Sequence, residues 1–271
     1  MTAHRTTEPR VSLGDRLRSR PLLTAILLAV LDHAIALGTA AVLAAALPKL
    51  PGYSVTGFSR AFLVAIFVTA YVLIVLALPR WWGLAGFATP RSEWRDLRLY
   101  LLPLVLVFVP FVAGIKMPTG TALVILALGY LMTGVAEEGM YRGVILGLLR
   151  PLGVWPAVLI SSLLFGLAHA DNLVVRGFSA IVLLQMFGSA VQGIGYAALR
   201  LRTNTIWPLI LIHAAHDLAL QMGFLPVPLV EAVVDTIFLV YGIVLLRRSR
   251  REDLPHPPAL PVPATRVTTA R

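Results

Sequence analysis

The sequence predicts an all-α protein, a polytopic bundle of about eight transmembrane helices. Its 271 residues are 58% hydrophobic and only 13% charged, and the mean hydropathy is +0.83. Soluble domains carry a charge on about a quarter of their residues, so these values indicate an integral membrane protein. The apolar residues also fall into runs of spanning length, because a helix that crosses a bilayer needs about 20 of them.

Eight apolar segments meet this length requirement. Several of them are separated by Pro-Gly, Pro-Thr-Gly and Arg-Pro junctions, which break helices. The fourth segment is long and the fifth is short. The predicted spans are 22–47, 61–78, 99–115, 121–149, 155–170, 178–199, 206–223 and 227–246.

The basic residues predict the orientation of these spans. With eight spans, most of the +10 formal charge collects on one side, which the positive-inside rule assigns to the cytoplasm together with both termini. Arginines at span ends bind anionic lipid headgroups, so we expect these lipids, and no nucleic acid, as partners. The cytoplasmic set is Arg5 to Arg20, Arg80, Arg91, Arg95, Arg98, Arg150, Arg200, Arg202 and Arg247 to Arg251; the opposite set is Lys49, Arg60, Lys116 and Arg176.

Three regions follow along the chain. Residues 1–20 are polar and basic, residues 21–246 form the predicted transmembrane domain, and residues 247–271 are rich in proline and charge, which predicts a disordered cytoplasmic tail. Trp81, Trp82, Trp155 and Trp207 fall at predicted cytoplasmic span ends, as interface anchors do. The chain has no cysteine, which excludes disulfides, thiolate metal sites and a cysteine nucleophile.

The fourth span contains charged residues that are costly in lipid. Each ionised group at a helix centre costs about 2.5–3.5 kcal/mol, so Glu137, Glu138 and Arg142 must face protein or trapped water. Glu138 and Arg142 are four residues apart and can form an ion pair, either as a structural tie or as part of a site. Glu137 points about 100° away from Glu138 and is therefore available for a role outside this ion pair.

Two further spans carry histidines and an aspartate. Phe165 and His169 share a face at the end of the fifth span, and His213 and Asp217 share a face of the seventh. An interhelical hydrogen-bond network is the structural alternative, but such bonds are worth only about 0.6–2 kcal/mol each. A helical rise of about 1.5 Å per residue lets these residues and Glu137 converge at one depth, which predicts an enclosed site.

Other polar residues have simpler explanations. Asp32 and His33 in the first span are interpreted as a partly buried polar pair, with contact to the site as the alternative. Asp171 and Asn172, after His169, are interpreted as a cap or turn.

Three motifs resemble those of a known family. Glu137-Glu138-x-x-x-Arg142, Phe165-x-x-x-His169 and His213-x-x-x-Asp217 are similar, in order and spacing, to the signatures of type II CAAX prenyl endopeptidases, whose bacterial members are also called CPBP or Abi proteins. The resemblance covers residues 80–223, the family-like protease core. It implies an intramembrane protease, here in a bacterial cytoplasmic membrane.

The resemblance also implies roles for these residues. Glu137 is the expected general base, and His169 helps it to activate a water molecule. His213 and Asp217 are expected to polarise the scissile carbonyl and stabilise the oxyanion, while Glu138 and Arg142 support the fourth helix. Many relatives have asparagine where this chain has Asp217, and an ionised aspartate cannot donate to an oxyanion.

The chemistry is also compatible with a metal. Without a cysteine or a Ser-His-Asp set, water is the expected nucleophile, and an enclosed carboxylate can serve as its base. Alternatively, Glu137, His169 and His213 form a three-ligand set with an open position, as catalytic zinc prefers. No HExxH motif decides between these mechanisms.

The resulting hypothesis is a protease that cleaves a peptide or small protein at the membrane. The alternative is a non-catalytic scaffold or bacteriocin self-immunity protein that binds a peptide through the same polar cluster. A proton- or ion-coupled transporter is a third interpretation, because buried carboxylates and histidines also serve as relays. The sequence shows no inverted repeat of the kind found in many transporters.

Overall fold

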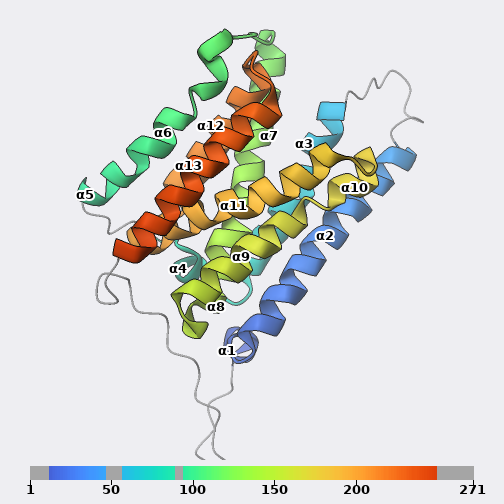
Figure 1. The fold of residues 1–271 in the computed structure, drawn as a ribbon. Coiled ribbons are helices and arrows are strands. Elements are labelled where there is room, and N and C mark those ends of the chain that lie inside the picture. Colours follow the sequence, from blue (N-terminus) through green and yellow to red (C-terminus); the bar gives the residue numbers. More distant parts are fainter. Residues whose placement is uncertain (1–11, 47–56, 89–93, 249–271) are drawn as a thin grey trace, which may run out of the picture.

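The protein is a helix bundle. A computed structural model describes residues 12–46, 57–88 and 94–248, and within these ranges it contains one isolated β-bridge, between Ile115 and Gly223, and no strand (Figure 1). The predicted all-α polytopic fold is confirmed. The ends of the chain at 1–11 and 249–271 lie outside the described residues, and with them most of the predicted tail.

The helices follow one another along the chain with short connections. In chain order they are α1 (Leu13–Arg18), α2 (Pro21–Ala46), α3 (Gly57–Ala77), α4 (Trp82–Ala85), α5 (Trp94–Leu97), η2 (Arg98–Tyr100), α6 (Leu101–Leu106), η3 (Val109–Ala113), α7 (Gly120–Glu137), η4 (Glu138–Ile145), α8 (Leu146–Leu149), η5 (Arg150–Leu152), α9 (Val154–Ala168), α10 (Asp171–Arg176), α11 (Ala180–Thr203), α12 (Trp207–Met222) and α13 (Val227–Arg248).

Each of the eight predicted spans contains a helix or a run of short helices. Five runs among the described residues are long and apolar enough to cross a membrane: Pro21–Ala46, Gly120–Leu152, Val154–Val174, Ala180–Thr203 and Val227–Arg248. Two shorter apolar helices, Phe62–Ala77 and Arg98–Ala113, accompany them. Eight crossings therefore stay a prediction, while the membrane-spanning character of the bundle is clear.

The third predicted span is broken rather than continuous. The helix α6 ends at Leu106, and a 3-10 helix with Pro110 in its first turn follows. Proline has no N–H to donate to the preceding turn, and its ring clashes with the carbonyl four residues earlier. The segment therefore runs as short pieces along the side of α12 and α13.

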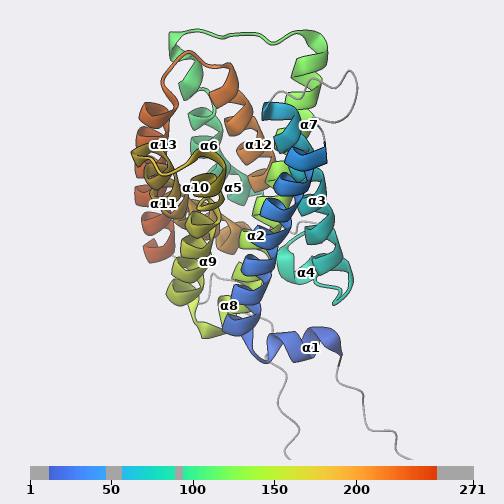
Figure 2. The ribbon, with the colours of Figure 1, turned by 90° about the vertical axis from the view of Figure 1, so that its right-hand side faces the viewer.

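The central helices pack between two flanking layers. In Figure 1, α5 and α6 lie on the left of the bundle and α2, which packs against α3, on the right; Figure 2 views the bundle from the α2 side. Between them, α11 packs against α9 and α13, and α12 packs against α7. The helices that carry the predicted site residues are thus the inner ones.

Small residues allow the inner helices to approach closely, as is usual in membranes. Gly134 on α7 faces the carbonyl of Ile210 on α12, and a Cβ at this position would lie 2.7 Å from that oxygen. This contact lies one turn before Glu137 and one turn before His213. The distance between α7 and α12 at the site therefore depends on a residue without a side chain.

We predict that Gly134→Ala destabilises the bundle, because the added methyl group must push α12 away from α7. Overpacking of this kind costs about 1–3 kcal/mol, measurable as a shift of the unfolding transition of the purified protein in mixed micelles. Gly38→Ala in α2 is the matched control, since nothing lies within 4 Å of a Cβ there. Equal stability of the two variants would contradict the close contact.

Candidate active site

The fourth span changes its helical geometry at the two glutamates. The helix α7 ends at Glu137, and residues Glu138–Ile145 form a π-helix before α8 continues the same span. A π-helix has i→i+5 hydrogen bonds and a wider turn, is rare, and is frequent at functional sites. Here it brings all eight of its residues into the protein interior.

Glu138 and Arg142 form the ion pair that their spacing predicts. Arg142 Nη1 lies 3.3 Å from Glu138 Oε1, and both side chains have 0% exposure. The guanidinium carbon also lies 3.8 Å from the centre of the Phe165 ring on α9. The cation is thus neutralised by a carboxylate on one side and by the negative face of an aromatic ring on the other.

His213 on α12 joins this pair to Glu137. Its Nδ1 lies 2.7 Å from Glu138 Oε1, so the Nδ1–H donates to the carboxylate and fixes the orientation of the ring. Its Nε2 faces two other carboxylates, Glu137 Oε2 at 3.5 Å and Asp217 Oδ2 at 3.6 Å. Tyr196 on α11 stacks on the imidazole, with the two ring planes 8° apart.

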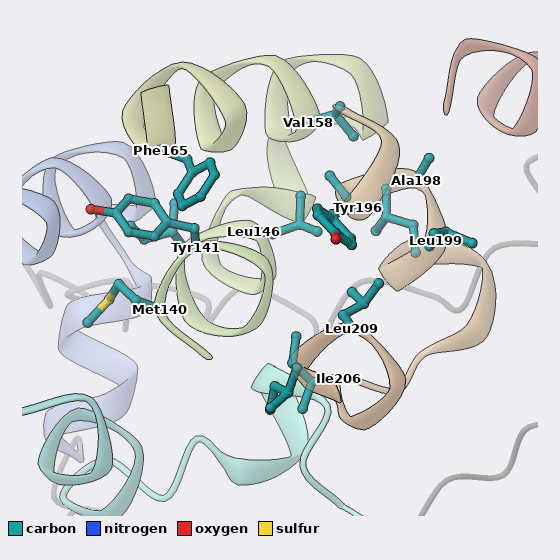
Figure 3. Close-up of a cluster of buried hydrophobic side chains, with 14 of the residues drawn as sticks. Met140, Tyr141, Leu146, Val158, Phe165, Tyr196, Ala198, Leu199, Ile206 and Leu209 are labelled. Carbon is teal, nitrogen blue, oxygen red and sulfur yellow. The ribbon is translucent and has the colours of Figure 1, made fainter. Parts of the chain in front are cut away.

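His169 occupies the C-cap of α9. Its Nδ1 lies 3.1 Å from the carbonyl oxygen of Phe165, and because a carbonyl can only accept, Nδ1 carries the proton. In the neutral ring the lone pair then lies on Nε2. The Phe165 ring is a neighbour of both histidines: its centre lies 5.0 Å from the centre of the His169 ring and 6.4 Å from that of His213 (Figure 3 shows Phe165).

Exposure divides the polar residues into two groups. The side chains of Glu137 and Asp217 are 30% and 24% exposed, while His213 is 8% exposed and Glu138 is sealed off. His169 is half-buried. The side chains of Glu137, Asp217 and His169 therefore keep some exposed surface, whereas Glu138 and Arg142 contact only protein.

The structure thus brings together Glu137, His213 and Asp217, with Glu138 and Arg142 directly behind them. His169 bonds to the carbonyl of Phe165. Among the described residues, the ion pair of Glu137 is with His213 and not with His169. The three sequence motifs therefore converge on the inner faces of α7, α9 and α12.

The donor atoms do not fit a metal site well in this arrangement. Within residues 12–46, 57–88 and 94–248, no three His, Asp or Glu side chains are placed as a group that could hold a metal ion. His213 has its Nδ1 engaged by Glu138 and its Nε2 directed at two carboxylates. No catalytic step is therefore assigned to zinc, and the ligand set Glu137, His169 and His213 stays a prediction.

The helix α2 reaches the same region, which sequence patterns did not establish. Asp32 is buried and accepts a hydrogen bond of 3.2 Å from the hydroxyl of Tyr141, one turn after Glu137. His33 pairs with Asp171 at 3.2 Å, which ties α2 to α10. Asp32 and His33 thus have separate partners on other helices, and the contact of Asp32 is with a residue of the π-helix. The sequence signal for this contact was the aspartate Asp32 inside an otherwise apolar span.

Two further residues were missed. Glu231 on α13 pairs with His216 at 3.3 Å and explains a second histidine in the seventh span as a tie between helices. Tyr196, which stacks on His213, lies in an ordinary apolar stretch of α11. No sequence pattern distinguishes this tyrosine from other buried aromatic residues.

Comparison with known proteins gives one family match. Residues 119–219 match the family model of type II CAAX prenyl endopeptidases, Rce1-like. No curated protein and no solved structure matches the chain. The matched range begins just before α7 and ends within α12, so it contains all three motifs. The part of the chain that is similar to the type II CAAX prenyl endopeptidase Rce1-like family therefore holds Glu137, His169, His213 and Asp217.

Proposed function

We propose that the protein hydrolyses a peptide bond of a membrane-associated or lipidated peptide, with water activated by Glu137 and His169. The family match supports an intramembrane endopeptidase of the CAAX type in general. The observation that carries the finer proposal is the contrast between two adjacent carboxylates. Glu137 is accessible and lies 3.5 Å from His213, whereas Glu138 is sealed into an ion pair.

Glu137 is the proposed general base. A general base must be reachable by the attacking water and must lie within hydrogen-bond distance of it. The carboxylate of Glu137 keeps 30% of its exposure, so a water molecule can bind to it. His169, with its Nδ1–H held by the Phe165 carbonyl, presents the Nε2 lone pair as a second acceptor for this water.

His213 is the proposed electrophile. With its Nδ1–H bound to Glu138, a protonated ring directs its Nε2–H into the space between Glu137 and Asp217. This N–H can donate to the carbonyl oxygen as negative charge develops on it, the kind of preorganised donor that stabilises an oxyanion. Asp217, an acceptor when ionised, then stabilises the protonated His213 and does not contact the oxyanion.

The proposed reaction balances without a further reactant. Glu137 removes a proton from water, the resulting hydroxide attacks the scissile carbonyl carbon, and the negative charge moves to the carbonyl oxygen beside His213. The tetrahedral intermediate collapses, the C–N bond breaks, and Glu137 returns its proton to the leaving amine. The products are a carboxylic acid and an amine, and the side chains return to their initial state.

The location of the reaction follows from the fold. We propose a bacterial cytoplasmic membrane with both termini in the cytoplasm, as the distribution of arginines predicts. The site residues lie on α7, α9 and α12, within the bundle, so a substrate peptide must enter between helices. A lipid-anchored or membrane-bound peptide is already concentrated there.

We predict that Glu137→Gln abolishes cleavage while leaving the fold intact. Glutamine keeps the shape of the side chain but cannot accept a proton at this step, and loss of a general base lowers rates about 10²–10⁴-fold. The measurement is the appearance of new peptide termini, detected by mass spectrometry, when the purified protein in lipid nanodiscs is incubated with farnesylated and unmodified peptides ending in Cys-aliphatic-aliphatic-X.

Several outcomes separate this proposal from the alternatives. Glu231→Gln, which removes a carboxylate from α13 outside the site, is the matched control and should cleave normally. Cleavage by Glu137→Gln at the wild-type rate removes the catalytic assignment. Binding of the peptides without cleavage by the wild-type protein favours the scaffold or immunity interpretation.

A separate prediction concerns the zinc alternative. With the water mechanism described above, dialysis against a strong chelator leaves the cleavage rate unchanged, because no step uses a metal. Loss of activity on chelation and its recovery on addition of zinc would assign Glu137, His169 and His213 to a metal centre instead. Metal content of the purified protein, measured by mass spectrometry, decides the same question independently of activity.

We predict that the buried pair behaves as one unit. Glu138→Gln leaves a buried cation and Arg142→Met leaves a buried anion, and removing one partner of such a pair costs about 3–5 kcal/mol. The double variant should regain much of this stability in unfolding measurements, because no uncompensated charge remains. Strictly additive losses in the double variant would show that the two side chains do not compensate one another.

A further inference from the structure

A polar cavity lies at the end of the bundle that the arginine distribution predicts to be cytoplasmic. Its volume is about 370 Å³, many times the roughly 30 Å³ of a water molecule. It is formed by α1, the turn between α3 and α4, the segment η5 and the C-cap of α11. The lining residues are Ser12, Gly14, Asp15, Arg18, Pro79, Arg80, Trp81, Gly83, Leu84, Arg150 and Asn204.

The cavity is strongly basic. Arg18, Arg80 and Arg150 line it, from three separate parts of the chain, and Asp15 is the one acidic residue among the lining residues. A fourth guanidinium, that of Arg200, lies behind the wall. It is buried and donates to the Leu84 carbonyl at 3.1 Å and to Asn204 Oδ1 at 2.9 Å. Three arginines and one carboxylate thus line the space, and a fourth arginine lies behind its wall.

A buried donor in the wall has no acceptor within the part of the chain that the structure describes. Trp81 is only 4% exposed, and its Nε1 has no hydrogen-bond partner among the described residues. The atom lies against Gly14, another lining residue, where a Cβ would stand 3.2 Å from it. Buried N–H groups are nearly always paired, so an unpaired one indicates a missing acceptor. The sequence places Trp81 among interface anchors, but the structure buries it beside the cavity.

The backbone at the cavity is held in an unusual conformation. After α3, the N–H of Trp81 bonds to the Leu76 carbonyl and the N–H of Arg80 to that of Ala77, the pattern of a Schellman turn. The turn requires a left-handed residue, usually glycine, and here Arg80 takes this position with φ +59°. An arginine thus occupies a position where its backbone is strained, and its side chain lines the cavity.

We propose that this cavity binds the phosphate of an anionic phospholipid headgroup. Guanidinium groups bind phosphate oxygens in bidentate fashion, and the indole N–H supplies a further donor to an acceptor-rich group. The setting is a membrane interface: Leu13 on α1 and Trp82 beside the cavity are 53% and 39% exposed apolar side chains. Acyl chains can lie against these residues while the phosphate enters the cavity.

The lipid site is independent of the proposed proteolysis. None of its lining residues belongs to the three motifs, and Asn204, its boundary on α11, lies two turns beyond Tyr196, which stacks on His213. Lipid binding is therefore measured directly, without a cleavage assay. Failure of one proposal leaves the other standing.

The test is native mass spectrometry of the purified, delipidated full-length protein in detergent, titrated with phosphatidylglycerol or phosphatidylcholine. The wild-type protein should retain phosphatidylglycerol at least about tenfold more tightly, which corresponds to one charge-assisted hydrogen bond. Arg80→Asn removes a cation but tolerates the left-handed backbone, and Trp81→Phe removes the N–H but keeps an aromatic ring. Each should reduce this preference several-fold.

The control is Arg16→Gln, which removes the same charge from α1 at an exposed position that does not line the cavity. It should bind phosphatidylglycerol like the wild type. Equal binding of both lipids, or an equal loss in Arg16→Gln and Arg80→Asn, overturns the proposal. If millimolar inorganic phosphate displaces phosphatidylglycerol completely, the cavity is assigned to free phosphate instead of a lipid. Thermal unfolding without lipid checks that the variants are folded.

Discussion

The centre of this protein is built around the buried guanidinium group of Arg142. Arg142 lies in the middle of a membrane span and is 1% exposed, so its charge must be compensated entirely by neighbouring side chains. The carboxylate of Glu138 and the faces of Phe165 and Tyr196 provide this compensation, and the same carboxylate accepts the Nδ1–H of His213. The side chains come from η4, α9, α11 and α12. Four helices are thereby oriented around one cation.

This arrangement gives adjacent glutamates different properties. Glu138 pairs with Arg142 and His213, while Glu137, one residue earlier, remains partly exposed and faces Nε2 of the same histidine. A single imidazole thus connects the structural carboxylate to the reactive one. The buried pair holds the ring, and the ring sets the position at which a substrate carbonyl can be polarised. His213 therefore belongs both to the buried structural network and to the proposed reactive group.

Much of the fold follows from hydropathy alone. The first span is predicted at 22–47 and found at Pro21–Ala46, and the last is predicted at 227–246 and found at Val227–Arg248. Length and apolarity are enough to predict such segments, because backbone groups in a bilayer must be hydrogen-bonded within the segment, and an α-helix achieves this. The break at Pro110 is visible in the sequence as a proline, but its position inside an otherwise apolar run gave no reason to divide the span. The π-helix has no hydropathy signal at all.

The site was predictable to a similar degree. Charged residues in lipid indicate Glu137, Arg142 and Asp217 because burial there is costly, and the spacing of Glu138 and Arg142 predicts their pair. The bond between Glu138 and His213 is not predictable, since it joins residues far apart in the chain through the packing of α7 on α12. Nor is the link from Asp32 to Tyr141, which depends on where α2 docks.

The π-helix makes the number of residues in this span as important as their identity. Its wider turns accommodate Glu138–Ile145 between two α-helical stretches of one continuous segment. A π-turn holds one residue more than an α-turn, so deleting one residue there would let ordinary α-helical bonding resume with α7 and α8 in nearly their present orientation, while the side chains inside the segment changed their spacing. A deletion between Glu138 and Arg142 would shorten the four-residue spacing of their ion pair although both charged residues were still encoded. Reading-frame-preserving deletions in this stretch should be far less tolerated than most substitutions beside them.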